Sequence, residues 1–187
     1  EQVPLRKNFN ETAFFFPALQ TDNKGNVSIK FTLPESVTTW RFMGLAHDKH
    51  MNNALVEAIT VAKKSVMIMP NMPRFIRMGD ESVLSNRIVN TTNVAQTAQV
   101  EMQILDPKTE KQLLSSSKKI TLAANSTSNC DFTLVPSQLR SMGYDLDAVV
   151  CRMKVNGESF SDGEQHLLTI LSDKEHIVTT LAFSQYE

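Results

Sequence analysis

Apolar and polar residues alternate along most of this chain, and a period of two predicts β-strands rather than helices. In residues 26–33, Val27, Ile29 and Phe31 point one way while the residues between them point the other. The same alternation predicts further strands at residues 38–47, 54–63, 65–69, 82–92, 98–106, 118–124, 128–135, 147–155 and 164–171. The pattern therefore predicts an all-β fold built as an antiparallel β-sandwich, with residues 82–92 and 98–106 as antiparallel neighbours.

The strands are unevenly distributed, which divides the chain in two. About eight are expected between residues 65 and 171, enough for a complete sandwich, but only about four between residues 10 and 62. The sequence thus predicts a boundary near residues 61–64. Residues 1–62 would be a partial β-sandwich whose missing strands lie upstream of Glu1, and residues 63–187 would be complete.

Two local signals interrupt the strands. Residues 21–26, with Asn23 and Gly25, are typical of a hairpin turn that joins a strand around Phe14 to the strand at 26–33. Residues 136–147 are the one place where a short helix is expected, with Pro136 in its first turn and Gly143 after its end.

Three adjacent aromatic residues, Phe14, Phe15 and Phe16, precede Pro17. A strand in a sandwich buries one of its faces, so Phe14 and Phe16 fit the core and Phe15 requires another cover. A neighbouring domain would supply that cover. The alternative is a bulge or bend at Pro17 that turns Phe15 inward.

Composition and charge exclude several classes of protein. Apolar residues make up 41% of the 187, and charged residues 21%, as in ordinary globular domains. A net charge of −1 argues against nucleic-acid binding. The apolar runs are only a few residues long, far below the roughly 20 needed to span a bilayer. The chain starts at Glu1 without an initiator methionine, which suggests a piece of a longer protein.

We interpret the cysteines and methionines as core residues. Cys130 is in phase with Phe132, and Cys151 with Met153, so both thiols are expected to face one core, with a disulfide left open. The methionine-rich run is expected to fill the core or a domain boundary, with a soft binding surface as the alternative; it comprises Met67, Met69, Met72 and Met78.

One long segment resembles a known family. Residues 9–47 carry an aromatic-Pro strand, then "GNVSIKFTLPESVTTW", then a strand that continues through Gly44, and residues 70–80 carry "PNMPRFIRMGD". This arrangement is similar to the segment of the alpha-2-macroglobulin family that follows the bait region, and its wording is closest to bacterial members. The resemblance implies that residues 1–62 are the C-terminal half of a split macroglobulin-like domain. It likewise implies that residues 63–187 are a complete one.

The resemblance also prompts a search for the family's thioester motif, Cys-x-Glu-Gln. In "SDGEQHLL" Asp162 stands where that cysteine would be, and a carboxylate cannot form a thioester. We therefore interpret this stretch as a turn followed by the last strand, which Gly163, Glu164 and Gln165 open.

The remaining candidates have simple structural interpretations. His47, Asp48 and His50 could hold a metal in principle, but a solvated hairpin tip is the preferred interpretation. His166 and His176 are interpreted as surface histidines. Four Asn-x-Ser/Thr sequons are expected to arise by chance in turns and begin at Asn10, Asn26, Asn90 and Asn125.

These observations predict no catalytic, cofactor-binding or metal-binding residue. The function expected from the resemblance is that of non-catalytic scaffold domains in a bacterial protease-trapping inhibitor of the cell envelope or extracellular space. Its partners would be neighbouring domains of the parent chain and, in the full-length protein, target proteases, with self-association of the fragment also expected. The alternative is a cell-surface adhesion or carbohydrate-binding β-sandwich.

Overall fold

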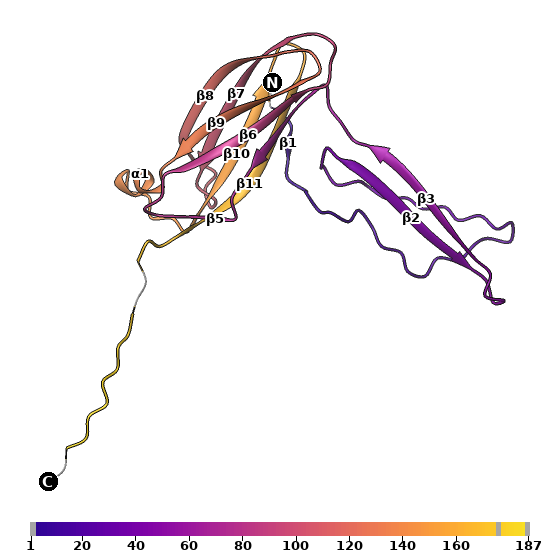
Figure 1. Cartoon of the computed structure of the whole chain (residues 1–187), viewed down its shortest axis with the longest axis horizontal. Coiled ribbons are helices and arrows are strands. Elements are labelled where there is room, and N and C mark those ends of the chain that lie inside the picture. The colour runs from indigo at the N-terminus through magenta and orange to yellow at the C-terminus, as the bar shows by residue number, and fades with distance from the viewer. Residues whose placement is uncertain (1–2, 175–176, 186–187) are drawn as a thin grey trace.

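The computed structural model describes residues 3–174 and 177–185, and it is almost entirely β (Figure 1). Its elements in chain order are β1 (Leu5–Arg6), β2 (Thr39–His47), β3 (Asn53–Val61), β4 (Val66–Asn71), β5 (Phe75–Arg77), β6 (Ser82–Asn90), β7 (Gln96–Leu105), β8 (Gln112–Leu122), β9 (Ser126–Leu134), α1 (Pro136–Ser141), β10 (Ala148–Asn156) and β11 (Ser161–Leu171). The all-β class predicted from the alternation is confirmed.

Strands β4 to β11 form a sandwich of two sheets. One sheet has the order β1-β11-β10-β7-β8, with β5 also paired to β11, and the other has the order β4-β6-β9. Strands β6, β7, β9 and β10 point every second side chain inward, and Val149, Cys151, Met153 and Val155 of β10 are all completely buried. Eight strands lie between residues 65 and 171, as the sequence approximately predicted, but β5 corresponds to none of the predicted strand ranges.

One predicted pairing is wrong. Residues 82–92 and 98–106 were expected to be antiparallel neighbours, but β6 pairs with β4 and β9 while β7 pairs with β8 and β10. The connection between β6 and β7 crosses from one sheet to the other, as sandwich topologies commonly require. Alternation identifies strands that have one buried face, but it does not tell which sheet each one joins.

The short helix is confirmed at α1, with Pro136 at its N-terminal position and Leu139 buried in the core. Gly143 follows with φ +90, a left-handed conformation in which glycine is least strained. In the described part of the chain, no helix is long and apolar enough to cross a membrane.

Residues 7–62 have much less regular structure than the sandwich. Strands β2 and β3 pair in register from Thr39↔Val61 to His47↔Asn53 as an isolated two-stranded hairpin, which projects from the sandwich (Figure 1). The strands expected around Phe14 and at residues 26–33 do not form, and Val27 and Phe31 are 44% and 46% exposed. The predicted turn is present, closed by the amide of Asp22 donating to the carbonyl of Asn26 at 2.8 Å, with Gly25 at φ +81.

The phenylalanines cover one face of this hairpin. The ring of Phe14 stacks on Phe16 at 5.1 Å and lies 4.3 Å from Phe31 and 6.1 Å from Phe42 of β2. Phe15 is 81% exposed, so no bend at Pro17 turns it inward. That a neighbouring domain covers Phe15 therefore stays a prediction.

Candidate functional site at the N-terminal strand

The first described strand belongs to the sandwich, although it precedes the hairpin in sequence. Strand β1 pairs in parallel with β11, with Leu5 opposite Gly163 and Arg6 opposite Glu164 (Figure 1). A Cβ atom at Gly163 would lie 2.7 Å from Cδ2 of Leu5 and 3.1 Å from the carbonyl oxygen of Met153. The close approach of Leu5 to β11 therefore depends on glycine at this position.

Arg6 enters the space between the two sheets and makes four polar contacts there. Its Nε and Nη2 donate to Oδ1 and Oδ2 of Asp162 at 3.0 and 2.7 Å, a bidentate geometry. Its Nη1 lies 2.9 Å from Oε1 of Glu164, and Nη2 also donates to the carbonyl of Ile68 in β4 at 2.7 Å. One side chain of β1 thus contacts strands of both sheets.

Asp162 is the centre of this cluster and is completely buried. Besides Arg6 it accepts hydrogen bonds from Nζ of Lys64 at 2.7 Å and from the amide of Ile68 at 3.0 Å. Buried ions need such full pairing, because the cost of removing them from water is several kcal/mol each. Strands β1, β4 and β11 are therefore connected through a single carboxylate.

Aromatic contacts extend the cluster along β11. Nε2 of His166 lies 2.8 Å from Oε2 of Glu164, and the imidazole stacks on the ring of Phe9 at 4.9 Å with an interplanar angle of 7°. The guanidinium of Arg6 lies 6.0 Å from the centre of the same Phe9 ring. Residues 6–9 therefore follow the edge of β11 from Asp162 to His166.

Electrostatics favour the charged form of Arg6 at this place. Burial alone would lower its pKa, but the hydrogen bonds and negative charge of Asp162, followed by those of Glu164, raise the pKa above its ordinary value. The guanidinium stays protonated, so the ion pairs persist over the whole pH range in which the carboxylates are ionised.

The tripeptide that suggested a thioester has a different role. Residues Asp162 to Gln165 all lie within β11, which begins three residues before the predicted strand at 164–171, because the turn that joins β10 to β11 is at residues 157–160. Asp162 and Glu164 share the inward face of β11 with Leu168 and Ile170. Acidic residues in phase with buried apolar residues were the sequence signal for a buried ion pair, and our sequence analysis missed it.

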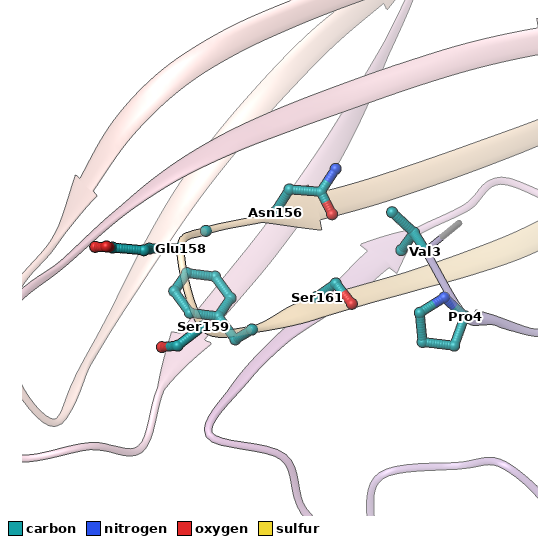
Figure 2. A pocket seen from close by; sticks show the side chains of 8 residues that line it. Val3, Pro4, Asn156, Glu158, Ser159 and Ser161 are labelled. Carbon is teal, nitrogen blue, oxygen red and sulfur yellow. The ribbon is translucent and has the colours of Figure 1, made fainter. Parts of the chain in front are cut away.

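Two shallow hollows flank β1. One of about 550 Å³ lies between Val3, Pro4 and the turn from Asn156 to Ser161, where Figure 2 shows these side chains around the chain reversal. The other, of about 500 Å³, lies on the outer face of the sheet beside Glu101, Arg152 and Lys154. Nε of Arg152 donates to Gln165 at 2.7 Å and its Nη2 to Glu110 at 3.1 Å, so these side chains already pair with one another.

The hairpin provides the second notable surface. The face of the hairpin turned away from the phenylalanines is open and carries apolar side chains around the Arg41–Glu57 ion pair. The exposed fractions are 60% for Met43, 70% for Leu45, 61% for Leu55, 69% for Ile59 and 59% for Val61. An exposed apolar sheet face with two free edges is a site for association.

The histidine candidates do not form a metal site. Asp48 is the base of a turn, and its carboxylate accepts from the amides of His50 and Asn52 at 2.8 and 3.0 Å. His47 is at the end of β2 in the same exposed tip. Over residues 3–174 and 177–185 the structure contains no cluster of three metal-ligating side chains, and His176 lies outside these residues.

Three of the sequon asparagines are exposed: Asn10, Asn26 and Asn125. The fourth, Asn90, is 1% exposed, and its Nδ2 donates to the carbonyls of Val94 and Ala123 at 2.8 and 2.9 Å. Its amide nitrogen is therefore committed to the fold.

Both cysteines are free and buried, Cys130 on β9 and Cys151 on β10, as their phase predicted. The methionines divide between two environments. Met78 lies in the core and Met72 packs against it, whereas Met67 and Met69 are half-buried on β4, where Nη2 of Arg87 lies 3.3 Å from the sulfur of Met69.

The sequence model of the Alpha-2-macroglobulin family matches residues 12–102, which run from the phenylalanine segment through the hairpin into β7. This part of the chain is therefore similar to the alpha-2-macroglobulin family.

Individual relatives agree with this assignment. The chain is 28% identical over 184 residues to a protein of Thermotoga maritima named Alpha-2-macroglobulin, covering 93% of this chain and 12% of that protein. It is 30% identical over 87 residues to an Alpha-2-macroglobulin homolog of Nostoc sp., covering 46% of this chain and 5% of that protein. The chain thus spans a small fraction of the length of these bacterial relatives.

Among solved structures, a cycloisomaltooligosaccharide glucanotransferase of Paenibacillus sp. is similar with a TM-score of 0.42 and 17% identity, over 57% of this chain and 14% of that one. At this level the likeness carries no argument about function.

Proposed function

We propose that this chain provides non-catalytic scaffold modules of a bacterial alpha-2-macroglobulin-like inhibitor that traps proteases. Residues 1–62 would be the C-terminal half of a split macroglobulin-like domain just after the bait region, and residues 63–187 a complete domain. Cleavage of the bait would change the packing of these modules against their neighbours, and this rearrangement would enclose the protease.

The observation that carries the proposal is the contrast between the two surfaces of the matched segment. Within residues 12–102, β4 and β6 are already packed in a sandwich, whereas Met43, Leu45 and Ile59 of the hairpin are more than half exposed. A scaffold module that contacts other domains requires such an unsatisfied apolar face. Neighbouring domains of the parent chain would cover it, and a similar contact would cover Phe15.

The cellular location belongs to the same proposal. A protein that encloses foreign proteases meets them outside the cytoplasm, so we place the parent in the cell envelope, either periplasmic or anchored to the outer membrane, or in the extracellular space. No enzymatic step is assigned to any residue of the chain, and no cofactor is required.

The test uses the parent protein mixed with a broad-specificity protease. A trapped protease still hydrolyses a small peptide substrate but no longer cleaves a protein-sized one, and this difference measures enclosure. We expect Met43→Asp combined with Ile59→Asp to abolish enclosure, because two carboxylates would stand in the face that the neighbouring domain must cover.

The matched control is Val83→Asp, a charge at a 61% exposed apolar position on the outer face of β6, which should leave enclosure intact. The proposal is wrong if the unmodified parent does not shield the protease. It is also wrong if the hairpin variant shields as well as the control does.

A further inference from the structure

Strand β1 is attached to the sandwich, but the apolar core of the sandwich does not depend on β1. The apolar core that the structure describes runs from Val66 to Ile170 and takes no residue from β1. Leu5 lies on the outer face of the sheet against Gly163, and Arg6 reaches the interior only through its guanidinium. Removing β1 would therefore leave the apolar core intact.

The backbone contribution to this attachment is small. The ladder between β1 and β11 contains only two residue pairs, and a parallel pairing of that length is weak by itself. The buried pairs of Arg6 with Asp162 and Glu164 must supply most of the remaining attachment. A buried ion pair is costly to break on one side only, because the partner charge then remains in the interior without compensation.

For this reason the attachment is expected to have two discrete states. With β1 in place, Asp162 is completely buried and has four donors, from Arg6, Lys64 and Ile68. With β1 released, the same carboxylate would keep Lys64 and Ile68, and water would replace the guanidinium at the open edge of β11. Partial displacement satisfies neither arrangement, so the strand is expected to be either fully docked or fully released.

The segment that follows β1 connects this site to the other part of the molecule. The amides of Lys7 and Asn8 both donate to Oε2 of Glu35, at 2.7 and 2.9 Å, and the amide of Glu35 donates back to the carbonyl of Asn8 at 2.8 Å. Glu35 lies shortly before β2. A displacement of the hairpin relative to the sandwich would consequently act on residues 7–8 and then on Arg6.

We propose that residues 3–9 are a releasable strap, held at the edge of β11 by the Arg6–Asp162–Glu164 cluster, which opens as a unit while the sandwich stays folded. The strap is the contact through which the N-terminal module and the sandwich influence each other. Its existence does not depend on protease trapping, and only its use as a relay rests on the function proposed above.

Hydrogen exchange of the whole chain, resolved by amide, tests the strap. In the unmodified protein we expect the amides of residues 5–6 to exchange faster than those of β7 and β10, which reports a separate local opening. In Arg6→Ala, exchange at residues 5–6 should rise by about 100-fold or more, while β7 and β10 keep their rates. Arg6→Lys keeps the charge but loses the bidentate geometry, and should fall between the two.

Two further variants make the result specific. Gly163→Ala adds a Cβ against Leu5 without touching any charge, and should also accelerate exchange at residues 5–6. Arg41→Ala removes an exposed ion pair with Glu57, 2.6 Å long, and should change nothing at β1.

The strap is disproved if residues 5–6 exchange only at the rate of β10, because β1 would then open only with global unfolding. It is also disproved if Arg6→Ala leaves the exchange unchanged, or if it unfolds β7 and β10 together with β1. Protease shielding is not measured here, so failure of the strap and failure of the proposed trapping function are separate results.

Discussion

The sandwich and the hairpin use the same alternating pattern with opposite results. In β10 every second residue from Val149 to Val155 is completely buried, whereas none of the nine residues of β3 is buried. Both strands would be read from sequence as half-buried. What differs is the presence of a second sheet, which the sandwich supplies from its own residues and the hairpin does not.

An apolar strand face requires a cover, but the alternating pattern does not tell whether the chain itself supplies that cover. Ile59 and Val61 are as suited to a core as Ile88 is, but a two-stranded ribbon with one partly covered face cannot bury them. Where the chain does not provide a cover, the face is free for an outside partner. The predictions below probe whether the two regions differ as sharply in solution.

The largest expected contrast is in thiol reactivity. Burial raises the pKa of Cys151 to about 12, so its thiolate fraction in mildly alkaline buffer should be on the order of 10³-fold below that of an exposed cysteine. Introducing Leu45→Cys places a thiol at a 70% exposed position of the hairpin. Titration with a disulfide reagent, at a protein concentration too low for the hairpin face to self-associate, should show one fast thiol at position 45, with Cys130 and Cys151 reacting only as the sandwich opens.

In denaturant all three thiols should react at similar rates, which is the control for reagent access. Fast reaction of Cys151 in the native protein would mean that the core around β10 is more open than the structure indicates.

A matched pair of isoleucine substitutions gives the next contrast. Ile88 is completely buried on β6, and Ile88→Ala should lower the free energy of unfolding by about 2–5 kcal/mol, because it leaves a cavity. Ile59 is 69% exposed on β3, and Ile59→Ala should change it by less than about 0.5 kcal/mol. Urea denaturation, followed by a spectroscopic signal of the folded sandwich, measures both changes in the free energy of unfolding. Equal losses would show that Ile59 is covered in solution.

The sandwich was largely predictable from sequence because each of its strands carries its own signal. Cys151 and Met153 are in phase along β10, and Pro136 and Gly143 bound the helix, so local patterns identify these elements without knowledge of their partners. The pairing of β6 and β7 was wrong because sheet membership depends on the path of a connection, which alternation does not encode.

The N-terminal part was less predictable for a different physical reason. Residues 26–33 have a strand pattern, yet within the described part of the chain they pair with no other strand and form none themselves. The candidate site was missed because Arg6 is separated from Asp162 by 156 residues, and no sequence spacing reports such a contact. Only the alternation that places Asp162 and Glu164 in phase with buried apolar residues could have indicated this contact.

Self-association is the third contrast and follows from the open hairpin face. We expect the isolated chain to dimerise through Met43, Leu45 and Ile59, as judged by light scattering over a range of concentrations. Ile59→Asp should weaken the dimer by about tenfold or more, because burying a charge in the contact is unfavourable. Val83→Asp, on the outer face of the sandwich, should leave it unchanged. A monomer at all concentrations would show that the face does not self-associate.

The smallest expected effect concerns the junction between the two regions, at Glu35. Hydrogen bonds from the amide of Lys7, and then from that of Asn8, lower the pKa of the Glu35 carboxyl from its ordinary value. A lowered pKa means that the junction's contribution to stability is complete above the unfolded value and is lost as the pH falls through the folded one.

The amide proton shifts of Lys7 and Asn8, followed by NMR against pH, should therefore titrate together, at a lower pH than an ordinary glutamate carboxyl does. Glu35→Gln retains an acceptor without the charge, so both amides should lose this titration while the sandwich keeps its stability. Glu11→Gln, an exposed carboxylate in the same part of the chain, is the control and should leave the titration in place. If the amides of Lys7 and Asn8 do not titrate in the unmodified chain, the hairpin and β1 are not joined through Glu35, and a displacement of one cannot reach Arg6 by that route.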